Sequence, residues 1–238
     1  RVLFRSTEEA ARKLRYAALE EEALALQADF IVTAHHSDDQ AETVLLKLLR
    51  GAGTEGLSGM QVRSGKLLRP LLYLTREHLE RYCQLQNIAY CYDSSNDDLH
   101  YTRNKIRKTL LPYLESNYNP SIKKALVRSA EILQEDDACL NQMAQEKFQA
   151  LATRTEEGVV LNVKKWQELP AALRKRILRQ AYFLAGGKEL SYIHTEALDV
   201  LCLRKTSGKY LQLPQKMIGF YKRGSLTIGL NKTIVLLP

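Results

Sequence analysis

A short apolar run that ends in a dense polar cluster constrains the fold of this chain more than any other feature. Residues 30–34 have the sequence FIVTA, and HHSDDQAE follows directly. A run so short, with two β-branched residues at its centre, predicts a buried parallel strand. Residues 39–50 carry apolar side chains at helical spacing and predict a helix capped by Asp38. The polar cluster therefore lies where a strand ends and a helix begins.

Helices and strands alternate through this half of the chain. Residues 7–26 and 75–86 predict helices, the second capped by Thr75, and residues 66–72 predict a strand with Pro70 at an edge or end. Glycines between 51 and 59 predict a loop. The alternation indicates an α/β fold with a Rossmann-like parallel sheet. The apolar stripes predicted to be buried are Ala10, Leu14, Ala17, Ala18 and Leu24 in the first helix, and Val44, Leu45, Leu48 and Leu49 in residues 39–50.

The pattern changes after Pro112. A long helix is predicted from Asn119-Pro120-Ser121 to about residue 152, followed by a strand at 159–163 and helices at 170–184 and 191–203. Residues 211–237 predict strands. We therefore expect two domains, residues 1–117 with the α/β sheet and residues 118–238, mostly helical with a small C-terminal β segment.

Charge and cysteine content narrow the class of protein. The net charge is +8, and it is concentrated in residues 101–128 and 164–179. Such clusters favour a polyanionic partner over a merely solvated helix face. No apolar run reaches the roughly 20 residues of a membrane span. The four cysteines form no C-x-x-C pair, which disfavours a zinc ribbon and indicates reduced thiols in a cytoplasmic protein.

The chemistry of the polar cluster follows from its spacing. His35 and His36 are adjacent, so they point in different directions and do not share one ion. Asp39 and Glu42 are three residues apart on one helix face and could hold Mg²⁺ or an ammonium group. Arg50 and the glycine-rich turn could meet a phosphate. Structural capping, an acid/base pair and a transition-metal site remain open at this point.

Five sequence blocks in order resemble a known family, tRNA(Ile)-lysidine synthetase, an ATPase of the PP-loop class. The blocks are ARKLRY (11–16), TAHHSDDQAETVLLKLLRGAGTEGLSGM (33–60), LLRPLL (67–72), DSSNDDLHYTRNKIRKTLLPYL (93–114) and SGKYLQLP (207–214). The resemblance implies a PP-loop domain followed by a substrate-binding domain. It also implies a cytoplasmic enzyme that uses ATP and Mg²⁺ to join free L-lysine to the wobble cytidine of a CAU-anticodon tRNA(Ile), through an adenylated tRNA. Some members of the family are homodimers.

The resemblance also suggests roles for individual residues. Asp39 would lie near ATP and Mg²⁺, with Ala34, His35 and His36 in the nucleotide pocket, and Glu42 would hold the ammonium group of lysine. Arg15 would meet phosphate or the activated intermediate. The tRNA contacts implied by the resemblance and by charge are Arg50, Arg103, Asn104, Lys105 and Arg107.

One feature of the family is missing from the printed sequence. The phosphate loop, SGGxDS, should follow the first strand, and no such motif occurs. We therefore expect an N-terminally truncated PP-loop domain that binds ATP poorly and is inactive alone. The alternatives are a non-catalytic RNA-binding fragment, another PP-loop tRNA-modifying enzyme such as a thiolase, or a histidine–aspartate metallohydrolase.

Overall fold

The computed structural model describes residues 7–91 and 97–232. The chain divides into two compact units, unit 1 with residues 1–137 and unit 2 with residues 138–238. One long helix, α7 (Ile122–Leu151), supplies residues to both units. The helix itself agrees with the one predicted from Asn119-Pro120-Ser121 to about residue 152. The two units are described separately below. The functional division predicted between residues 117 and 118 stays a prediction.

Unit 1 contains a small sheet built from three short strands, β1 (Ile31–Val32), β2 (Arg63–Ser64) and β3 (Leu67–Leu68). Their order is β1-β3-β2, with β1 parallel to β3 and β2 antiparallel to it. The predicted parallel pairing is confirmed. The predicted burial of residues 30–34 is wrong, because β1 is an edge strand and Val32 is 62% exposed.

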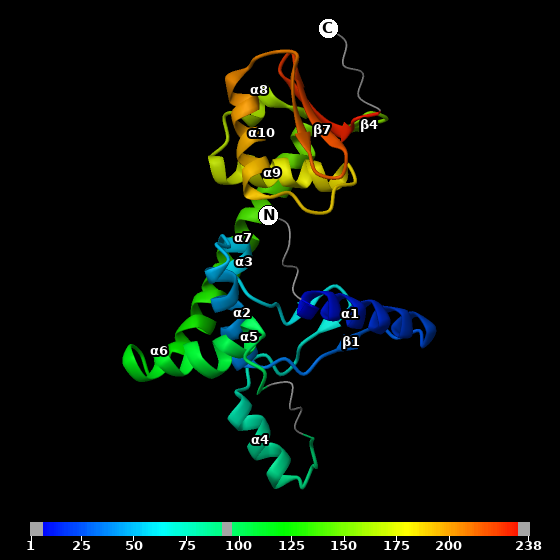
Figure 1. Ribbon diagram of the computed structural model, residues 1–238. Helices are drawn as coiled ribbons and strands as arrows, with labels where there is room; N and C mark the ends of the chain where they lie inside the picture. The colour runs from blue at the N-terminus through cyan, green and yellow to red at the C-terminus, as the bar shows by residue number, and fades with distance from the viewer. Residues whose placement is uncertain (1–6, 92–96, 233–238) are drawn as a thin grey trace. The chain divides into compact units, whose positions relative to one another are not determined.

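Helix α1 (Thr7–Ala25) agrees with the prediction for residues 7–26 and lies beside β1 (Figure 1). Its predicted buried stripe is wrong. Leu14 and Leu24 are 73% and 71% exposed, and Ala23 is the one buried residue among the described side chains of α1, residues 10–25. The described residues place no apolar layer over that side of α1, so helical periodicity alone misassigned the buried face. Ser6 and Glu9, three residues apart, predict a capping box at the start of this helix, and both side chains lie outside the described part.

Helix α2 (Ser37–Leu49) follows β1 and carries the polar cluster. Its N-cap is His36, so the prediction that Asp38 caps it is wrong: Asp38 lies inside the first turn. Val44 and Leu45 are buried as predicted, whereas Leu48 and Leu49 are 52% and 61% exposed. The last turn of α2 therefore lies outside the core. The buried residues of the helix lie nearer its start and include the polar Asp39, Gln40 and Glu42.

The glycine-rich loop after α2 contains one short helix, α3 (Thr54–Leu57), which the sequence analysis did not predict. Helix α4 (Arg76–Leu85) begins as predicted, with Thr75 Oγ1 accepting a hydrogen bond from the His78 N–H at 3.2 Å. The sequence of residues 87–92 predicts a short extended segment, but its described part, residues 87–91, contains no strand.

A continuous helical stretch completes unit 1. It comprises α5 (Thr102–Lys105), the π-turn η2 (Ile106–Leu110) and α6 (Leu111–Asn117). The Leu111 N–H bonds the Ile106 carbonyl, five residues back, just before Pro112, which cannot donate a hydrogen bond. Leu45, Ile106 and Leu111 form a buried cluster that fixes this stretch against α2.

Unit 2 is built on an antiparallel sheet of five strands, in the order β4-β5-β8-β7-β6. The strands are β4 (Ala152–Thr155), β5 (Gly158–Asn162), β6 (Lys209–Leu213), β7 (Met217–Lys222) and β8 (Ser225–Leu230), and the helices are α8 (Val163–Trp166), α9 (Ala171–Leu184) and α10 (Tyr192–Arg204). The predicted helices, including the Ser191 cap of α10, and the predicted C-terminal strands are confirmed up to residue 232. Residues beyond 232 lie outside the described part.

The core of unit 2 joins the sheet to its helices (Figure 1). Trp166, Ile177, Leu178, Leu198 and Leu226 are among its fully buried side chains. At roughly 25 cal/mol per Å² of apolar surface, each such side chain contributes about 1.5–3 kcal/mol. This core is larger than the cluster in unit 1, which holds three buried apolar residues.

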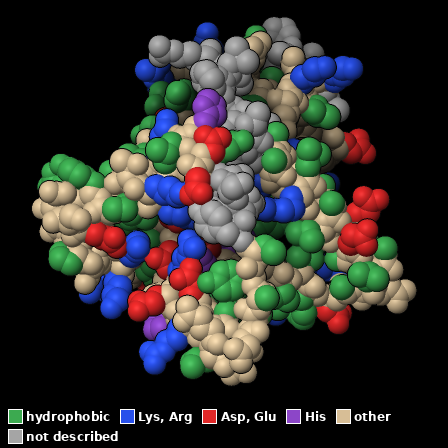
Figure 2. Space-filling model, turned by 60° about the horizontal axis from the view of Figure 1, so that its bottom comes forward, with side chains coloured by type: hydrophobic (Ala, Val, Ile, Leu, Met, Phe, Trp, Pro, Cys, Tyr) green, Lys and Arg blue, Asp and Glu red, His purple; other side chains and the backbone are tan. Residues whose placement is uncertain are grey.

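Several residues of both basic clusters make ion pairs or hydrogen bonds within their own unit. In residues 164–179, Arg174 pairs with Asp199 at 2.9 Å and Lys175 pairs with Glu196. Arg176 is buried and bonds Asn141 Oδ1 at 3.1 Å. Figure 2 likewise shows Lys and Arg side chains interspersed with Asp and Glu side chains on the face it draws. The sequence clusters are therefore not uniform positive faces.

Among the described helices, none combines the length and the apolar character needed to cross a bilayer.

Candidate active site

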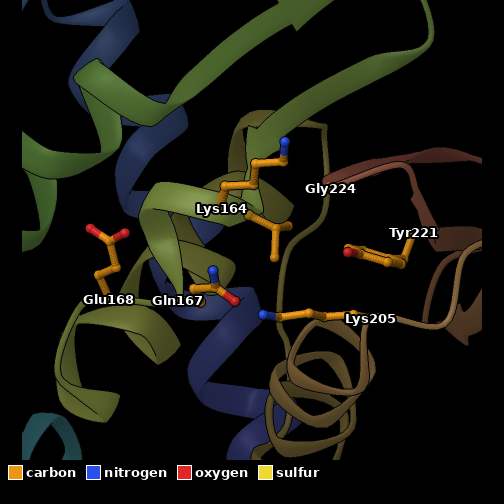
Figure 3. Close-up of a pocket in the computed structure, with 7 residues that line it drawn as sticks. Lys164, Gln167, Glu168, Lys205, Tyr221 and Gly224 are labelled. Atoms are coloured by element: carbon orange, nitrogen blue, oxygen red, sulfur yellow. The ribbon is translucent and has the colours of Figure 1, made fainter.

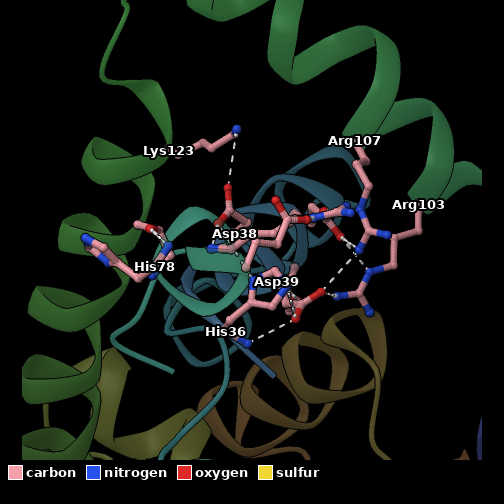
Figure 4. Close-up of polar contacts among 12 residues, drawn as sticks. His36, Asp38, Asp39, His78, Arg103, Arg107 and Lys123 are labelled. Atoms are coloured by element: carbon pink, nitrogen blue, oxygen red, sulfur yellow. Dashed lines mark hydrogen bonds and ion pairs between the residues drawn. The ribbon is translucent and has the colours of Figure 1, made fainter. Parts of the chain in front are cut away.

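Two acids of α2 and two arginines of the α5–η2 stretch form a closed ion-pair cluster (Figure 4). Arg103 Nε lies 2.8 Å from Glu42 Oε2, and Arg103 Nη2 lies 3.0 Å from Asp39 Oδ1. Arg107 Nε lies 2.5 Å from Glu42 Oε1, and its Nη2 lies 3.2 Å from Asp39 Oδ1. Each guanidinium therefore bridges both carboxylates. We call these four residues the acid–arginine cluster.

Local helix geometry explains why the four side chains converge. Asp39 and Glu42 are three apart on α2, and Arg103 and Arg107 are four apart along the facing stretch, so each pair shares one side. Ile106 lies between the arginines in sequence and packs with Leu45 of α2. The apolar contact holds the two helical segments together, and the charged side chains meet beside it.

Burial makes this cluster energetically important. The side chain of Glu42 is 2% exposed, while those of Arg103 and Arg107 are 21% and 26% exposed. An isolated carboxylate at such a depth would be very unfavourable, and the guanidiniums supply its charge partners. The hydrogen bond from Arg107 to Glu42 raises the pKa of Arg107 above its ordinary value. The guanidinium of Arg107 therefore stays charged at any physiological pH.

His36 and Asp38 make further contacts beside the acid–arginine cluster. The His36 N–H donates to Asp39 Oδ2 at 3.0 Å, which orients that carboxylate. Asp38 accepts a hydrogen bond from the Arg76 N–H at 2.9 Å and pairs with Lys123 at 3.3 Å. Burial alone would raise the pKa of Asp38, but these two contacts lower it. Asp38 thus ties α2 to the start of α4 and to α7.

His35 is half-buried and electrically neutral. Its Nδ1 lies 2.8 Å from Thr33 Oγ1. Burial lowers the pKa of His35 from 6.5 to about 4, and the positive charges of Arg103, Arg69 and Arg12 act in the same direction. A neutral imidazole is suited to hydrogen bonding and positioning rather than to carrying positive charge.

The other predicted site residues are not all brought together. Ala34, Arg50 and Lys105 are exposed. Asn104 is buried, and its Nδ2 donates to the Asp98 carbonyl at 2.9 Å, so it holds the loop before α5. Its predicted contact with tRNA stays a prediction. Arg15 is exposed and lies over the Tyr16 ring, 5.9 Å from its centroid. In α1 it is Arg12, not Arg15, that acts on the pKa of His35.

Sequence reasoning missed the residues that hold the loop beside α2. Gln40 is buried, and it donates to the Met60 carbonyl at 2.9 Å and accepts from the Met60 N–H at 2.7 Å. Gln134 of α7 bonds the carbonyls of Ser58 and Met60. Gly59 has φ +73°, and a Cβ there would come within 2.7 Å of Gln40. Buried glutamines carry no charge pattern, so only long-range contacts reveal this role.

The side chains of the acid–arginine cluster limit which metal ions it could hold. Within residues 7–91 and 97–232, no group of three His, Cys, Asp or Glu side chains is arranged to hold a metal ion. A transition-metal site therefore finds no support in the described residues. Mg²⁺ is commonly held by one or two carboxylates together with substrate phosphates, and Asp39 fits that requirement. Asp39 would have to exchange an arginine for the ion.

Comparisons with known proteins place the chain in a class and then in a family. Residues 1–114 match the model of a PP-loop domain, and residues 161–224 match that of a TilS substrate binding domain. The parallel β1–β3 pair, with the acids on the helix after β1, agrees with the first match. The fold and site thus define a protein of the PP-loop class. More narrowly, the chain belongs to the tRNA(Ile)-lysidine synthase family.

Individual relatives support this assignment. The tRNA(Ile)-lysidine synthase of Geobacter sulfurreducens is 39% identical over 90% of this chain and 46% of its own length. That of Leifsonia xyli is 42% identical over 82% of this chain and 59% of its own length. The chain thus spans about half the length of the relatives it matches. Among solved structures, U34-tRNA thiolase NcsA from Methanococcus maripaludis matches 56% of this chain and 46% of its own, with a TM-score of 0.44 and 18% identity. A similarity this weak does not indicate a function.

Proposed function

We propose that the protein containing this chain is a ligase that uses ATP to join free L-lysine to the wobble cytidine of a CAU-anticodon tRNA(Ile). Family membership supports the overall reaction. The structural observation that supports this reaction is the acid–arginine cluster. It presents two carboxylates and two guanidiniums at the end of β1, where open α/β sheets bind their ligands.

The reaction requires two displacement steps, one at phosphorus and one at carbon. The C2 carbonyl oxygen of cytidine attacks the α-phosphorus of ATP, and pyrophosphate leaves. An amine of lysine then attacks C2, AMP leaves with the former carbonyl oxygen, and the amine loses a proton. Phosphoryl chemistry of this kind needs positioning and charge neutralisation more than covalent help from the protein. Arginine and Mg²⁺ are suited to neutralising phosphate charge, and a carboxylate to holding an ammonium group.

Each residue of the cluster has a proposed role. Asp39 would hold Mg²⁺, whose contribution is to offset charge on the ATP phosphates. Glu42 would bind the ammonium of lysine. Both carboxylates already accept hydrogen bonds from Arg103 and Arg107, so the incoming cations must replace guanidiniums. The freed arginines could then meet phosphate of ATP or tRNA, which is consistent with their predicted tRNA contact.

The proposal is tested with the full-length protein that contains this chain. It is incubated with ATP, Mg²⁺, lysine and CAU-anticodon tRNA, and the digested nucleosides are analysed by mass spectrometry. A cytidine heavier by lysine minus water is expected. Asp39→Asn and Glu42→Gln should abolish it, whereas Glu77→Gln, an exposed acid of α4, should not. Wild-type protein that binds tRNA but incorporates no lysine would contradict the proposal.

Three finer points belong to this proposal. ATP use follows from the PP-loop class, while Mg²⁺ rests on the donor set of Asp39. Roles for Arg15, Arg50, Asn104 and Lys105 in binding phosphate or tRNA stay predictions. A homodimer and a cytoplasmic location also stay predictions.

A further inference from the structure

Unit 2 contains a cavity that is lined by none of the residues that the reaction above requires. Its volume is about 330 Å³, at the small end of ligand-binding cavities. Helix α8 supplies Val163 and Lys164, with Gln167 just after it, and Lys205, Tyr221 and Gly224 form the remaining walls (Figure 3). Lys205 directly follows α10, and the other two lie at or near the β7–β8 turn. We call this cavity the unit 2 pocket.

The backbone shapes the pocket around the two lysines. The Val163 N–H donates to the Gly224 carbonyl at 2.9 Å, which ties α8 to the β7–β8 turn. Gly224 has φ +84°, and a Cβ there would lie 3.3 Å from Lys164 Cε, so the side chain of Lys164 crosses directly over this glycine. Lys205 has φ +54° at the C-cap of α10, which turns the chain sharply where its side chain enters the pocket.

The charges of the pocket favour an anion. Among the described residues, no acid is seen within ion-pair distance of Lys164 or Lys205, whereas Arg174 and Lys175 of the same unit are both paired with acids. Glu168 also lines the pocket, but it extends away from Lys205 and Tyr221 (Figure 3). Gln167 and the phenol of Tyr221 add polar groups between the lysines. In Figure 3 the ammonium group of Lys205 points toward Gln167, whereas Lys164 runs past Gly224 and its nitrogen points away from Lys205. Two positively charged side chains that line one small cavity favour an anion there.

We propose that the unit 2 pocket binds a backbone phosphate of the tRNA. This inference rests on the function proposed above, because it assumes an RNA substrate. All the residues that line the pocket fall within residues 161–224, the region that matches a substrate binding domain. Lysine recognises phosphate as a point charge, without the planar geometry that carboxylate recognition by arginine uses. The pocket therefore positions the RNA without reading its sequence.

The test compares three lysine variants of the full-length protein. Lys164→Gln and Lys205→Gln remove the pocket charges, and Lys188→Gln removes an equally exposed charge outside it. The affinity for tRNA is measured by fluorescence anisotropy between 50 and 200 mM salt. Each pocket variant should bind roughly threefold to tenfold more weakly than wild type, with a log–log salt slope shallower by about 0.7–0.9. The control should change both quantities less than the pocket variants do.

Three other outcomes would overturn the proposal in different ways. If wild-type protein binds no tRNA at any salt concentration, the proposed function fails and the phosphate site fails with it. If wild type binds but the pocket variants behave like Lys188→Gln, the site alone is wrong. If the variants lose binding of inorganic phosphate, followed by NMR, yet bind tRNA normally, the pocket serves a free phosphate instead.

Discussion

Replacing Glu42 by glutamine is the most direct probe of the acid–arginine cluster. The substitution keeps size and shape but removes the charge that both guanidiniums share. Glu42 is 2% exposed, so the arginines lose a buried partner that water cannot fully replace. Removing one partner of a buried ion pair costs about 3–5 kcal/mol. Because Arg103 and Arg107 keep 21% and 26% of their side-chain surface exposed, we expect about 3 kcal/mol.

The matched control is Glu80→Gln. Glu80 accepts a hydrogen bond from Arg76 Nε at 2.6 Å, but both side chains are about half exposed, at 41% and 52%. An exposed i,i+4 pair is worth roughly 0.3–0.5 kcal/mol. The same chemical change should therefore have an effect several times smaller at residue 80 than at residue 42.

Two spectroscopic probes distinguish the unfolding of the two units in urea. Trp166, the single tryptophan, lies in unit 2, so its fluorescence follows that unit, while far-UV circular dichroism follows both. With an m-value of about 2 kcal/mol/M, Glu42→Gln should lower the midpoint of the unit 1 transition by about 1.5 M. The fluorescence midpoint should move less than this.

A double-mutant cycle with Arg107→Gln then isolates the pair. We expect a coupling energy between about 1 and 3 kcal/mol, since the two residues are in direct contact. A Glu42→Gln effect no larger than that of Glu80→Gln, or a coupling energy near zero, would show that the cluster does not form as described.

Three further predictions concern other contacts. Gly59→Ala should cost about 3 kcal/mol because its Cβ would meet Gln40, whereas Gly65→Ala, also at positive φ but in open space, should cost about 1 kcal/mol; thermal melts compare the two. Asp199→Asn should cost about 3 kcal/mol, reported by Trp166 fluorescence, because Arg174 lies 5.4 Å from that ring. The folded-state pKa of His35, about 4, is below the unfolded 6.5, so stability should fall as pH falls from about 6.5 to 4. His35→Gln should flatten that part of the urea-midpoint profile.

Local features of the sequence predicted many elements well. Thr75 and Ser191 cap α4 and α10 as expected, because a hydroxyl at the N-cap needs only the next turn of its own helix. Asp39 and Glu42 share a face because three residues make nearly one helical turn. The sequence blocks also pointed to the family that the comparisons show.

Predictions about burial were less successful. Leu14, Leu24, Leu48 and Leu49 have helical spacing but are exposed, because periodicity identifies an apolar side without showing what packs on it. Asp38 was expected at the N-cap but instead bonds the Arg76 N–H and Lys123, which are distant in sequence. The packing of α4 and α7 against α2 brings these partners to Asp38, and sequence spacing does not show that packing.

The sequence alone determined which residues carry charge, which turns and caps begin the helices, and which acids face the same way, since these depend on near neighbours along the chain. The tertiary structure decided where those charges go. Arg103 and Arg107, predicted from sequence to hold phosphate, pair with Asp39 and Glu42. In the second basic cluster, Arg174 and Lys175 pair with acids of α10. Lys164 of that cluster and Lys205, which sequence reasoning did not connect, line one pocket. Ion pairing depends on distance in space, and sequence spacing carries that information only within a helix or a turn.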